Sequence, residues 1–373
     1  MDAQAIDRLK RSITALCNQA LDIPTFFGRA REEIERVLPH DGCCAMTFDP
    51  ATLLPTSHIP YRSIPPEQVP RLAQNEYAED DVNKFAELWR ASPNVGIHSV
   101  ATHGHREESI RYRELLDPNG FENELRGVFN HDGSCWGGAA FYRGEDIPDF
   151  TLDEALGLAS ISELMADGIR RAALTQAVAI VDPIDAPGLV LVDGKGNLEA
   201  MNPAAKTWID QLVVSNEGPS ELPSPVYALI QRTRHAADSA EAGPAQVRAR
   251  TLSGQWVVMH GSLVEGTSDG RVAVIFEQAR APQLAPLIAA AYGLTSRERD
   301  VAALVIQGSS TKEIAERLFL SPHTVQDHLK STFNKVGVRS RRELVTQVFS
   351  EQYAPRMGAM PVGADGWFVP SAT

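Results

Sequence analysis

Residues 293–342 carry the feature that most constrains how this chain can fold. Two hydroxyl–carboxylate pairs are spaced there by three residues, Thr295 with Glu298 and Ser310 with Glu313, and a third, Ser340 with Glu343, ends one residue beyond it. Each pair fits a capping box, in which the two side chains satisfy free backbone N–H groups at the start of a helix. Ser321-Pro322 is a further start signal, a capping hydroxyl followed by proline at the first helical position. We therefore predict four short helices that begin near residues 296, 311, 322 and 341.

The apolar residues of these four helices recur at helical spacing and suit one small shared core. They are Val301, Leu304 and Val305, then Ile314, Ala315 and Leu318, then Val325, Leu329, Phe333 and Val336, and finally Leu344, Val345 and Val348. The short link Phe319-Leu320-Ser321 between the second and third helices suits a helix-turn-helix, whose second helix enters the DNA major groove.

This segment resembles the LuxR-type helix-turn-helix over about a sixth of the chain. The matching residues are Leu294, Thr295, Arg297, Glu298, Gly308, Lys312, Glu313, Ile314, Ala315, Leu318, Ser321, Thr324, Val325, His328, Lys335, Val338 and Arg341. One departure is Thr332, where the family usually has Ile, and Phe333 is the candidate to fill that volume.

The resemblance implies which side chains face DNA. Gln326, Asp327 and Lys330 would face the base edges, since Gln pairs with adenine, Asp accepts from cytosine and Lys donates to guanine. The other residues predicted to bind DNA, mostly through phosphates, are Ser309, Ser310, Thr311, Lys312, His323, Thr324, Lys335, Arg339 and Arg341. His328 is expected to be a packing residue, as in the family. The alternative is that these residues are only the solvated faces of amphipathic helices.

The charge balance favours a dimer. Residues 292–353 hold three Lys and six Arg against seven Asp and Glu, a net charge of +2, whereas the remainder of the chain carries −15. Attraction to phosphate should therefore be modest and sensitive to salt. A single unit would bind weakly, so we expect a homodimer that reads two half-sites on double-stranded DNA.

The length of 373 residues predicts two or three domains. We expect a first domain at 1–180, a second at 186–280, the helix-turn-helix domain at 290–353 and a flexible tail at 354–373. Four cysteines suit a reducing compartment rather than a disulfide framework. The first residues resemble no signal peptide and no run suggests a membrane helix, so the prediction is a cytoplasmic protein without a membrane partner.

The first predicted domain alternates helices with strands. Helices are expected at 3–20, 24–38, 66–76, 79–91, 107–116 and, as one long exit helix, 151–178; strands are expected at 43–48, 95–100, 125–129 and 136–142. The stretch FENELRGVFNHDGSCWGGAAFYR is similar to the last two sheet strands of GAF domains in multi-domain LuxR-type regulators. The apolar stripe of the exit helix could pair with its twin in a dimer and act as a signalling lever.

A GAF-type domain implies a small-molecule pocket over its sheet. The candidate ligand-binding residues are Phe85, Trp89, Tyr112, Phe121, Phe129 and Trp136. The alternative is that these aromatic side chains are ordinary core. Likewise, His98, His103 and His105 could bind a metal or simply face solvent, and Cys43-Cys44 could sense redox state or be buried thiols on opposite faces of a strand.

The second predicted domain begins with an apolar strand at 188–192, a Gly-Lys-Gly-Asn turn, a second strand and a helix opened by Asn202-Pro203. This order resembles the start of a PAS domain, and later strands fit 245–251, 255–262 and 271–277. His235 and His260 are its only histidines and it has no cysteine, so we expect no cofactor there and a structural or dimerising role.

The predicted fold class is therefore multi-domain α+β: GAF-like and PAS-like α/β sensor domains followed by an all-α, four-helix LuxR-type domain. The predicted function is a dimeric transcriptional regulator controlled by a small-molecule or protein signal, with DNA, a small-molecule effector and RNA polymerase as candidate partners. The alternative is a constitutive DNA-binding regulator whose first two domains serve only dimerisation and protein–protein interaction. An enzyme is not expected, because the sequence shows no nucleophile elbow, phosphate loop or metal-ligand spacing.

Overall fold

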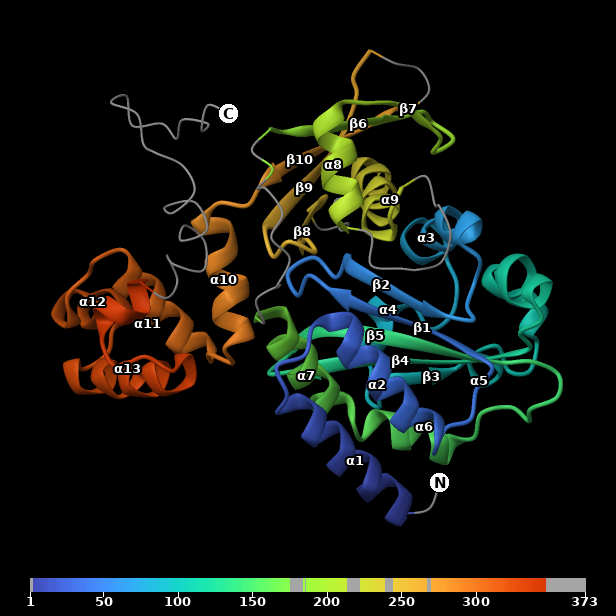
Figure 1. The fold of residues 1–373 in the computed structure, drawn as a ribbon, viewed down its shortest axis with the longest axis horizontal. Coiled ribbons are helices and arrows are strands. Elements are labelled where there is room, and N and C mark those ends of the chain that lie inside the picture. Colours follow the sequence, from blue (N-terminus) through green and yellow to red (C-terminus); the bar gives the residue numbers. More distant parts are fainter. Residues whose placement is uncertain are drawn as a thin grey trace, which may run out of the picture. The chain divides into compact units, whose positions relative to one another are not determined.

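The computed structural model describes residues 3–174, 184, 186–212, 222–238, 244–266 and 270–346. The chain divides into two compact units, Met1–Gln278 and Ala279–Thr373 (Figure 1). The first unit contains two separate five-stranded sheets, and the second contains helices.

The first sheet has the strand order β2-β1-β5-β4-β3, and each neighbouring pair is antiparallel. Its strands are β1 (Gly42–Phe48), β2 (Pro55–Tyr61), β3 (Val95–Ile97), β4 (Asn123–His131) and β5 (Ser134–Arg143). The long central hairpin of β4 and β5 turns at Asp132-Gly133, where both residues adopt a positive φ, as tight hairpin turns require.

Helices cover both faces of this sheet. A Cβ at Gly137 would lie 2.9 Å from Ile169 of α7 (Ser162–Leu174), and one at Gly138 would lie 2.9 Å from Phe85 of α4 (Phe85–Arg90). Because neighbouring residues of a strand face opposite sides, α7 lies on one face and α4 on the other. The other helices of this half are α1 (Ala3–Cys17), α2 (Ile23–Glu35), α3 (Val69–Ala78), α5 (His98–Ala101), α6 (Leu152–Ala159) and short turns at Pro66–Gln68, Arg106–Glu108, Tyr112–Leu116 and Asp117–Asn119.

The second sheet repeats the topology of the first. Its order is β7-β6-β10-β9-β8, again with every neighbouring pair antiparallel. When the strands of each sheet are counted along the chain, both sheets have the spatial order second, first, fifth, fourth, third. The strands are β6 (Gly188–Val192), β7 (Leu198–Met201), β8 (Gln246–Arg250), β9 (Trp256–Leu263) and β10 (Val272–Gln278), with helices α8 (Pro203–Leu212) and α9 (Ser224–Asp238) between β7 and β8. No internal repeat is visible in the sequence, so the duplication exists at the level of topology.

The two sheets are joined inside the first unit. Leu54, Val69 and Ala73, which come from the first half, are buried in the core cluster of the second sheet. Asp49, at the end of β1, accepts hydrogen bonds from the Nε (2.9 Å) and backbone amide (3.0 Å) of Arg248 on β8. Both residues are buried, with 1% and 7% of the side chain exposed. An ion pair of this kind fixes the two sheets relative to each other at one point.

The predicted single exit helix at 151–178 is wrong. The chain forms α6 and α7 with a break at Ser160–Ile161, and residues 175–178 lie outside the described part. Ile161, Met165 and Ile169 are each at most 1% exposed, because α7 packs on β4, β5, α1 and α2. The α7 part of the stripe is therefore packed inside the first unit, whereas Leu152 and Leu156 of α6 are exposed, so the predicted lever does not exist as one continuous free stripe.

Other elements of the first half also differ from prediction. Strand β2 is not among the predicted strands, the strand expected at 95–100 ends at Ile97 and continues as α5, and the helix expected at 79–91 is shortened to Phe85–Arg90. The helix expected at 107–116 is a 3-10 turn followed by a π-helical turn. The strands and the α8 start predicted for the second half are confirmed, to within one or two residues at their ends.

The second unit contains α10 (Ala281–Ala291), α11 (Ser296–Ile306), α12 (Thr311–Leu318), α13 (Pro322–Val336) and a last helix over 341–346. The four predicted starts are confirmed: Thr295, Ser310 and Ser321 accept from the third backbone amide of their helices, and Ser340 accepts from the amide of Glu343. Val301, Ile314, Val325 and Leu344 meet in one core. Helix α10 is not among the predicted helices, and the tail predicted at 354–373 lies outside the described residues.

Candidate functional site

Helices α12 and α13 form the helix-turn-helix. Phe319 ends α12 with a left-handed backbone (φ 55°), and its amide donates to the carbonyl of Ala315. Ser321 then caps α13, with Pro322 at the first turn. The left-handed residue lets the chain reverse within three residues, so α13 starts directly beside the end of α12.

Helix α13 has one buried and one exposed face. Val325, Leu329, Thr332 and Val336 are buried, at spacings of four, three and four residues. The exposed residues His323, Gln326, Asp327 and Lys330 recur at three, one and three residues, which places them on one side of the first two turns. His323 Nδ1 lies 3.1 Å from Asp327 Oδ2. These four residues share one solvent-exposed surface, called here the α13 polar face. It includes the three residues predicted to face base edges.

Several residues predicted to bind phosphate lie near the start of α12. Ser310 and Lys312 are exposed, and Thr311 is half-buried. Ser309 is buried, and its carbonyl accepts a hydrogen bond of 2.8 Å from Nη1 of Arg341. Nη2 of Arg341 also donates to the Thr311 hydroxyl at 2.9 Å. Arg341 therefore connects the last helix to the start of α12, a role that the sequence does not reveal.

Lys335 takes part in a polar cluster around the buried carboxylate of Glu298. Glu298, 4% exposed, accepts from Nζ of Lys335 at 2.7 Å, from the Ser331 hydroxyl at 2.6 Å and from the Thr295 amide at 2.7 Å. Burial opposes ionisation, but these hydrogen bonds outweigh it and lower the pKa of Glu298 to about 2. Because Lys335 also donates to the Gly293 carbonyl at 3.0 Å, its ammonium holds α11 and α13 together.

Three further residues complete the predicted set. Arg339 is exposed just after α13, and its amide donates to Glu343 at 2.8 Å. Thr324 is half-buried, with its hydroxyl 2.8 Å from that of Ser321. His328 is half-buried on α13, as a packing residue would be. Thr332 is fully buried, and its hydroxyl has no hydrogen-bond partner among the described residues.

The six predicted ligand-binding aromatics do not line one cavity. Phe85, Trp89, Tyr112 and Phe121 belong to or border the cluster that includes Val128 of β4. Phe129, next to Val128, faces the opposite side of the sheet, and Trp136 lies at the irregular register where β5 crosses Phe129 and Asn130. Phe129 and Trp136 are 1% and 3% exposed, so they are core residues. Of the six, Phe85 and Trp89 line a cavity within the first unit.

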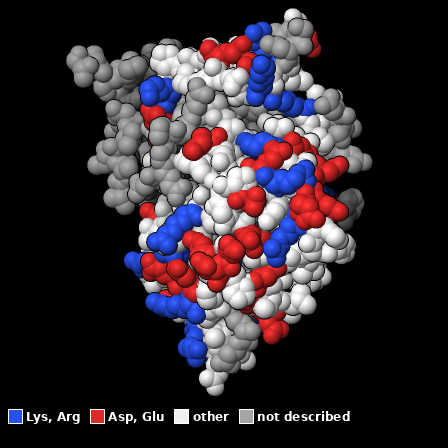
Figure 2. Space-filling model, turned by 90° about the vertical axis from the view of Figure 1, so that its right-hand side faces the viewer, with Lys and Arg blue, Asp and Glu red and all other residues white. Residues whose placement is uncertain are grey.

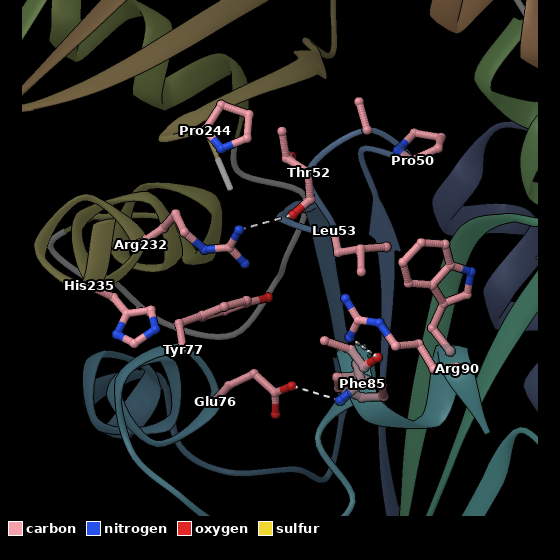
Figure 3. A pocket seen from close by; sticks show the side chains of 13 residues that line it. Pro50, Thr52, Leu53, Glu76, Tyr77, Phe85, Arg90, Arg232, His235 and Pro244 are labelled. Atoms are coloured by element: carbon pink, nitrogen blue, oxygen red, sulfur yellow. Dashed lines mark hydrogen bonds between the residues drawn. The ribbon is translucent and has the colours of Figure 1, made fainter. Parts of the chain in front are cut away.

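That cavity has a volume of about 330 Å³ and lies between the first-half residues 50–53, α3 and α4 and the second-half helix α9 (Figure 3). Its lining includes three residues that the sequence does not single out: Tyr77, Arg90 and Arg232. No sequence pattern predicts that these residues meet, since α9 is separated from α3 by about half the length of the unit.

A buried ionic network crosses the α4 side of the first sheet. Arg111 is fully buried, with its Nη2 2.8 Å from Glu124, and Arg126 lies 3.0 Å from Glu124 and 2.7 Å from Glu76. Burial and the neighbouring cations act in opposite directions on Glu124, and the net effect lowers its pKa. The signal for this network is present in the sequence as charged residues that alternate with apolar ones along β4.

The histidines and cysteines do not form a metal or redox centre in the described part of the chain. His98 is 1% exposed, whereas His103 and His105 are exposed, so the three do not converge. No group of three His, Cys, Asp or Glu that could hold a metal ion occurs among the described residues. All four cysteines are buried and none is in a disulfide, and burial raises the pKa of Cys17 to about 11 and that of Cys135 to about 12.

Comparison with known proteins identifies the second unit. Residues 293–348 match the family described as bacterial regulatory proteins, luxR family. Spore germination protein GerE of Bacillus subtilis is 44% identical over 55 residues, which are 15% of this chain and 74% of that protein. Mycobacterium bovis has a protein named as HTH-type transcriptional regulator Mb0914c that is 54% identical over 54 residues, 14% of this chain and 6% of the relative. The chain therefore carries a LuxR-type helix-turn-helix domain, and the similarity to these relatives is confined to it.

Solved structures add little about the first unit. The GAF domain of a cyanobacterial phytochrome, solved with bound phycoerythrobilin, aligns with 46% of this chain and 98% of its own length at 15% identity and a TM-score of 0.31. That score is too low to establish a shared fold, so the GAF-like and PAS-like assignments stay predictions. No helix of the described residues is long and apolar enough to cross a membrane.

Proposed function

We propose that this protein is a sequence-specific DNA-binding transcriptional regulator whose α13 reads the major groove. The observation that carries the proposal is the α13 polar face within a complete LuxR-type domain: four exposed polar side chains on the two turns that follow the helix start. A second helix presented in this way is how helix-turn-helix proteins reach base edges.

The chemistry of that face suits direct readout. Gln326 can pair with adenine, Asp327 can accept from cytosine, and Lys330 can donate to guanine. Ser310, Thr311, Lys312, Thr324 and Arg339 are proposed to contact phosphates, which fix register without reading sequence. Lys335 and Arg341 are proposed to act mainly by holding α11, α12 and the last helix in place, because both are engaged inside the domain.

The charge distribution agrees with DNA contact through the second unit. On the face of the molecule in Figure 2, acidic and basic side chains are interspersed, and no broad basic area is visible. The pairs Arg71–Glu79 and Arg71–Glu114 in the first unit show how its cations are neutralised locally. A unit with a net charge of only +2 needs help from a second copy, so we propose that a homodimer binds two half-sites.

The first unit is proposed to be the sensor. Between its GAF-like and PAS-like halves, as the sequence analysis predicts them, lies a cavity whose volume is at the small end of the range for ligand sites. A ligand can control DNA binding only if it binds one arrangement of the dimer more tightly than another.

The test is selection of random-sequence DNA duplexes by the full-length chain, followed by sequencing of the bound pool. Wild type is expected to enrich a motif with two related half-sites. Gln326→Ala should relax the preference at one base position in each half-site, at a cost of about 1–3 kcal/mol in discrimination. The matched control is Gln307→Ala, at the exposed end of α11.

Two outcomes would overturn the proposal. One is that wild type enriches no motif in the presence or absence of cell extract as a source of effector. The other is that Gln326→Ala and Gln307→Ala select the same motif with the same information content, since α13 would then not read bases.

A further inference from the structure

The cavity between the two halves of the first unit has a definite chemical character. It is bounded on one side by Leu53, by Tyr77 of α3 and by Phe85, Trp89 and Arg90 of α4, and on the other by Arg232 of α9 (Figure 3). At about 330 Å³ it is at the small end of the range for ligand sites. Because the Asp49–Arg248 ion pair and the packing of α3 on α9 join the two halves, the cavity is part of a built interface.

Among the described residues, Arg232 forms no ion pair with a carboxylate. The deeply buried arginines Arg111, Arg126, Arg143 and Arg248 each contact a carboxylate. Arg232 is half-buried, and among the described residues no carboxylate lies within ion-pair distance of it. Its hydrogen bond to the Thr52 carbonyl is a long one, 3.4 Å from Nη1. Burial also lowers the pKa of its guanidinium, the effect of removing water from a cation without supplying an anion.

The other charged groups of the lining do not compensate Arg232. Glu76 uses one carboxylate oxygen for Arg126, at 2.7 Å, and the other for the amide of Phe85, at 2.8 Å. Arg90 adds a second guanidinium, whose Nη1 donates to the Ala86 carbonyl of its own helix. His235 is exposed at the rim. A protein with a net charge of −13 thus presents a cationic cavity, which selects for anions.

The remainder of the lining is apolar and partly flat. Leu53, Phe85 and Trp89 supply the hydrophobic wall. Tyr77 lies below Arg232, with the guanidinium 5.8 Å from the ring centroid. Burial raises the pKa of Tyr77, so its hydroxyl stays protonated and can donate a hydrogen bond. In Figure 3 the Tyr77 hydroxyl and the Arg232 guanidinium point toward the same space.

We propose that this cavity binds a small organic acid, with its carboxylate on Arg232 and Tyr77 and its flat apolar body against Leu53, Phe85 and Trp89. The inference rests on the proposed function in that it names the ligand class of the sensor. The bound acid would contact α3 and α4 on one side and α9 on the other, so it would bridge the two sheets. Binding of the acid itself requires no DNA.

The experiment is calorimetric titration of the full-length chain with indole-3-acetate and phenylacetate, and with their neutral amides as uncharged twins. The fluorescence of Trp89 gives a second readout, isolated by comparison with Trp89→Phe. Both acids should bind, and each amide should bind at least tenfold more weakly. Arg232→Gln should weaken the acids at least tenfold and bring them to the level of the amides.

The matched control is Arg234→Gln. Arg234 is on the same helix two residues away, outside the cavity lining, and donates to the Asp193 carbonyl at 2.7 Å. Arg234→Gln should leave binding of the acids unchanged. Thermal unfolding of both variants checks that neither has lost its fold. A second variant, Tyr77→Phe, should weaken the acids more than the amides, because the hydrogen bond from the hydroxyl is stronger to a carboxylate.

The proposal is overturned if neither acid binds wild type at millimolar concentration, if acids and amides bind equally, or if Arg232→Gln and Arg234→Gln behave alike. DNA selection on the same wild-type preparation separates this failure from failure of the proposed function. A protein that selects a DNA motif but binds no acid would overturn only the ligand class, whereas acid binding without DNA selection would overturn only the regulator.

Discussion

At the scale of single residues, Thr332 is the clearest conflict between sequence and structure. Its hydroxyl is fully buried in the core of the second unit without a partner among the described residues. A buried unpaired hydroxyl costs about 1–3 kcal/mol, and an apolar side chain of the same shape removes that cost. The preference of the LuxR family for Ile at this position therefore has a physical counterpart: the core here suits an apolar side chain.

Thr332→Val is expected to stabilise the second unit by about 1 kcal/mol. Hydrogen exchange of the α13 amides in the full-length chain, followed by mass spectrometry, should show roughly fivefold greater protection. Thr311→Val is the opposing control, because the Thr311 hydroxyl accepts a hydrogen bond from Arg341 and its removal should reduce protection. Lower protection in Thr332→Val would mean that its hydroxyl is satisfied in solution.

Glu298 makes the second unit sensitive to acid. Its pKa is lowered in the folded state from an ordinary value of 4.5 to about 2. A carboxyl with a depressed folded pKa contributes stability that is complete above the unfolded pKa and is lost as the pH falls toward the folded one. The contribution, on the order of 3 kcal/mol, should therefore disappear between about pH 4.5 and pH 2.

The Ile314 methyl group, which lies in the core of the second unit, can report this loss by NMR of the methyl-labelled full-length chain. Glu298→Gln should lower the folded fraction at pH 5 and flatten its dependence on pH. Glu313→Gln is the matched control, because Glu313 has the same capping-box role on α12 but is exposed. Equal pH profiles for the two variants would rule out the buried cluster as the cause.

At the scale of elements, the close packing of α2 on α7 depends on Gly168. A Cβ at this position would lie 2.0 Å from the Phe26 ring, so Gly168→Ala should destabilise the first unit by about 1–3 kcal/mol. Gly28 of α2 is also helical, but a Cβ there would meet no atom within 4 Å, so Gly28→Ala should stabilise by about 0.5–1 kcal/mol. Thermal unfolding followed by tryptophan fluorescence measures both, and shifts of the same sign would contradict this packing.

The elements that can be predicted well from the sequence are those with local signals. Capping hydroxyls at Thr295, Ser310 and Ser321 mark helix starts by themselves, because the bonds that they make are within one turn. Strand β2 is not predicted because its signals are not local. Pro55–Tyr61 contains two prolines and alternates poorly, and it is an edge strand whose burial comes from its neighbour β1. The break between α6 and α7 is likewise set by the sheet on which they pack, since the apolar period continues through it.

The same distinction applies to the candidate sites. The α13 polar face follows from helical spacing within one element, so its residues can be predicted together. The residues of the cavity lining cannot be predicted together, because Tyr77, Arg90 and Arg232 come from three helices, two in the first half of the unit and one in the second. Aromatic composition alone points to Phe129 and Trp136 as well. Only the register of β4 and β5 places Phe129 on the face opposite Phe85.

At the scale of the whole molecule, two sheets of equal topology lie in one compact unit, and Asp49 with Arg248 connects them. The ion pair is buried and has three hydrogen-bond contacts from one residue to the other. Loss of one partner leaves an uncompensated buried charge, which typically costs about 3–5 kcal/mol, whereas replacement of both by apolar side chains is close to neutral. Coupling between the sheets can therefore be measured by a double-mutant cycle.

Asp49→Asn is expected to lower the thermal midpoint of the first unit strongly. Asp49→Leu combined with Arg248→Met should recover part of that loss, because the backbone amides of Ala51 and Arg248 still lose their acceptor. Trp136 is buried in the first half and Trp208 in the core of the second. The difference in signal between wild type and Trp136→Phe reports the first half, and the difference between wild type and Trp208→Phe reports the second. If the unit is cooperative, Asp49→Asn shifts both reporters together, although Asp49 belongs only to the first sheet. A shift confined to the reporter in the first half would show that the two sheets unfold independently. A ligand bound between them could then stabilise one sheet without changing the stability of the other.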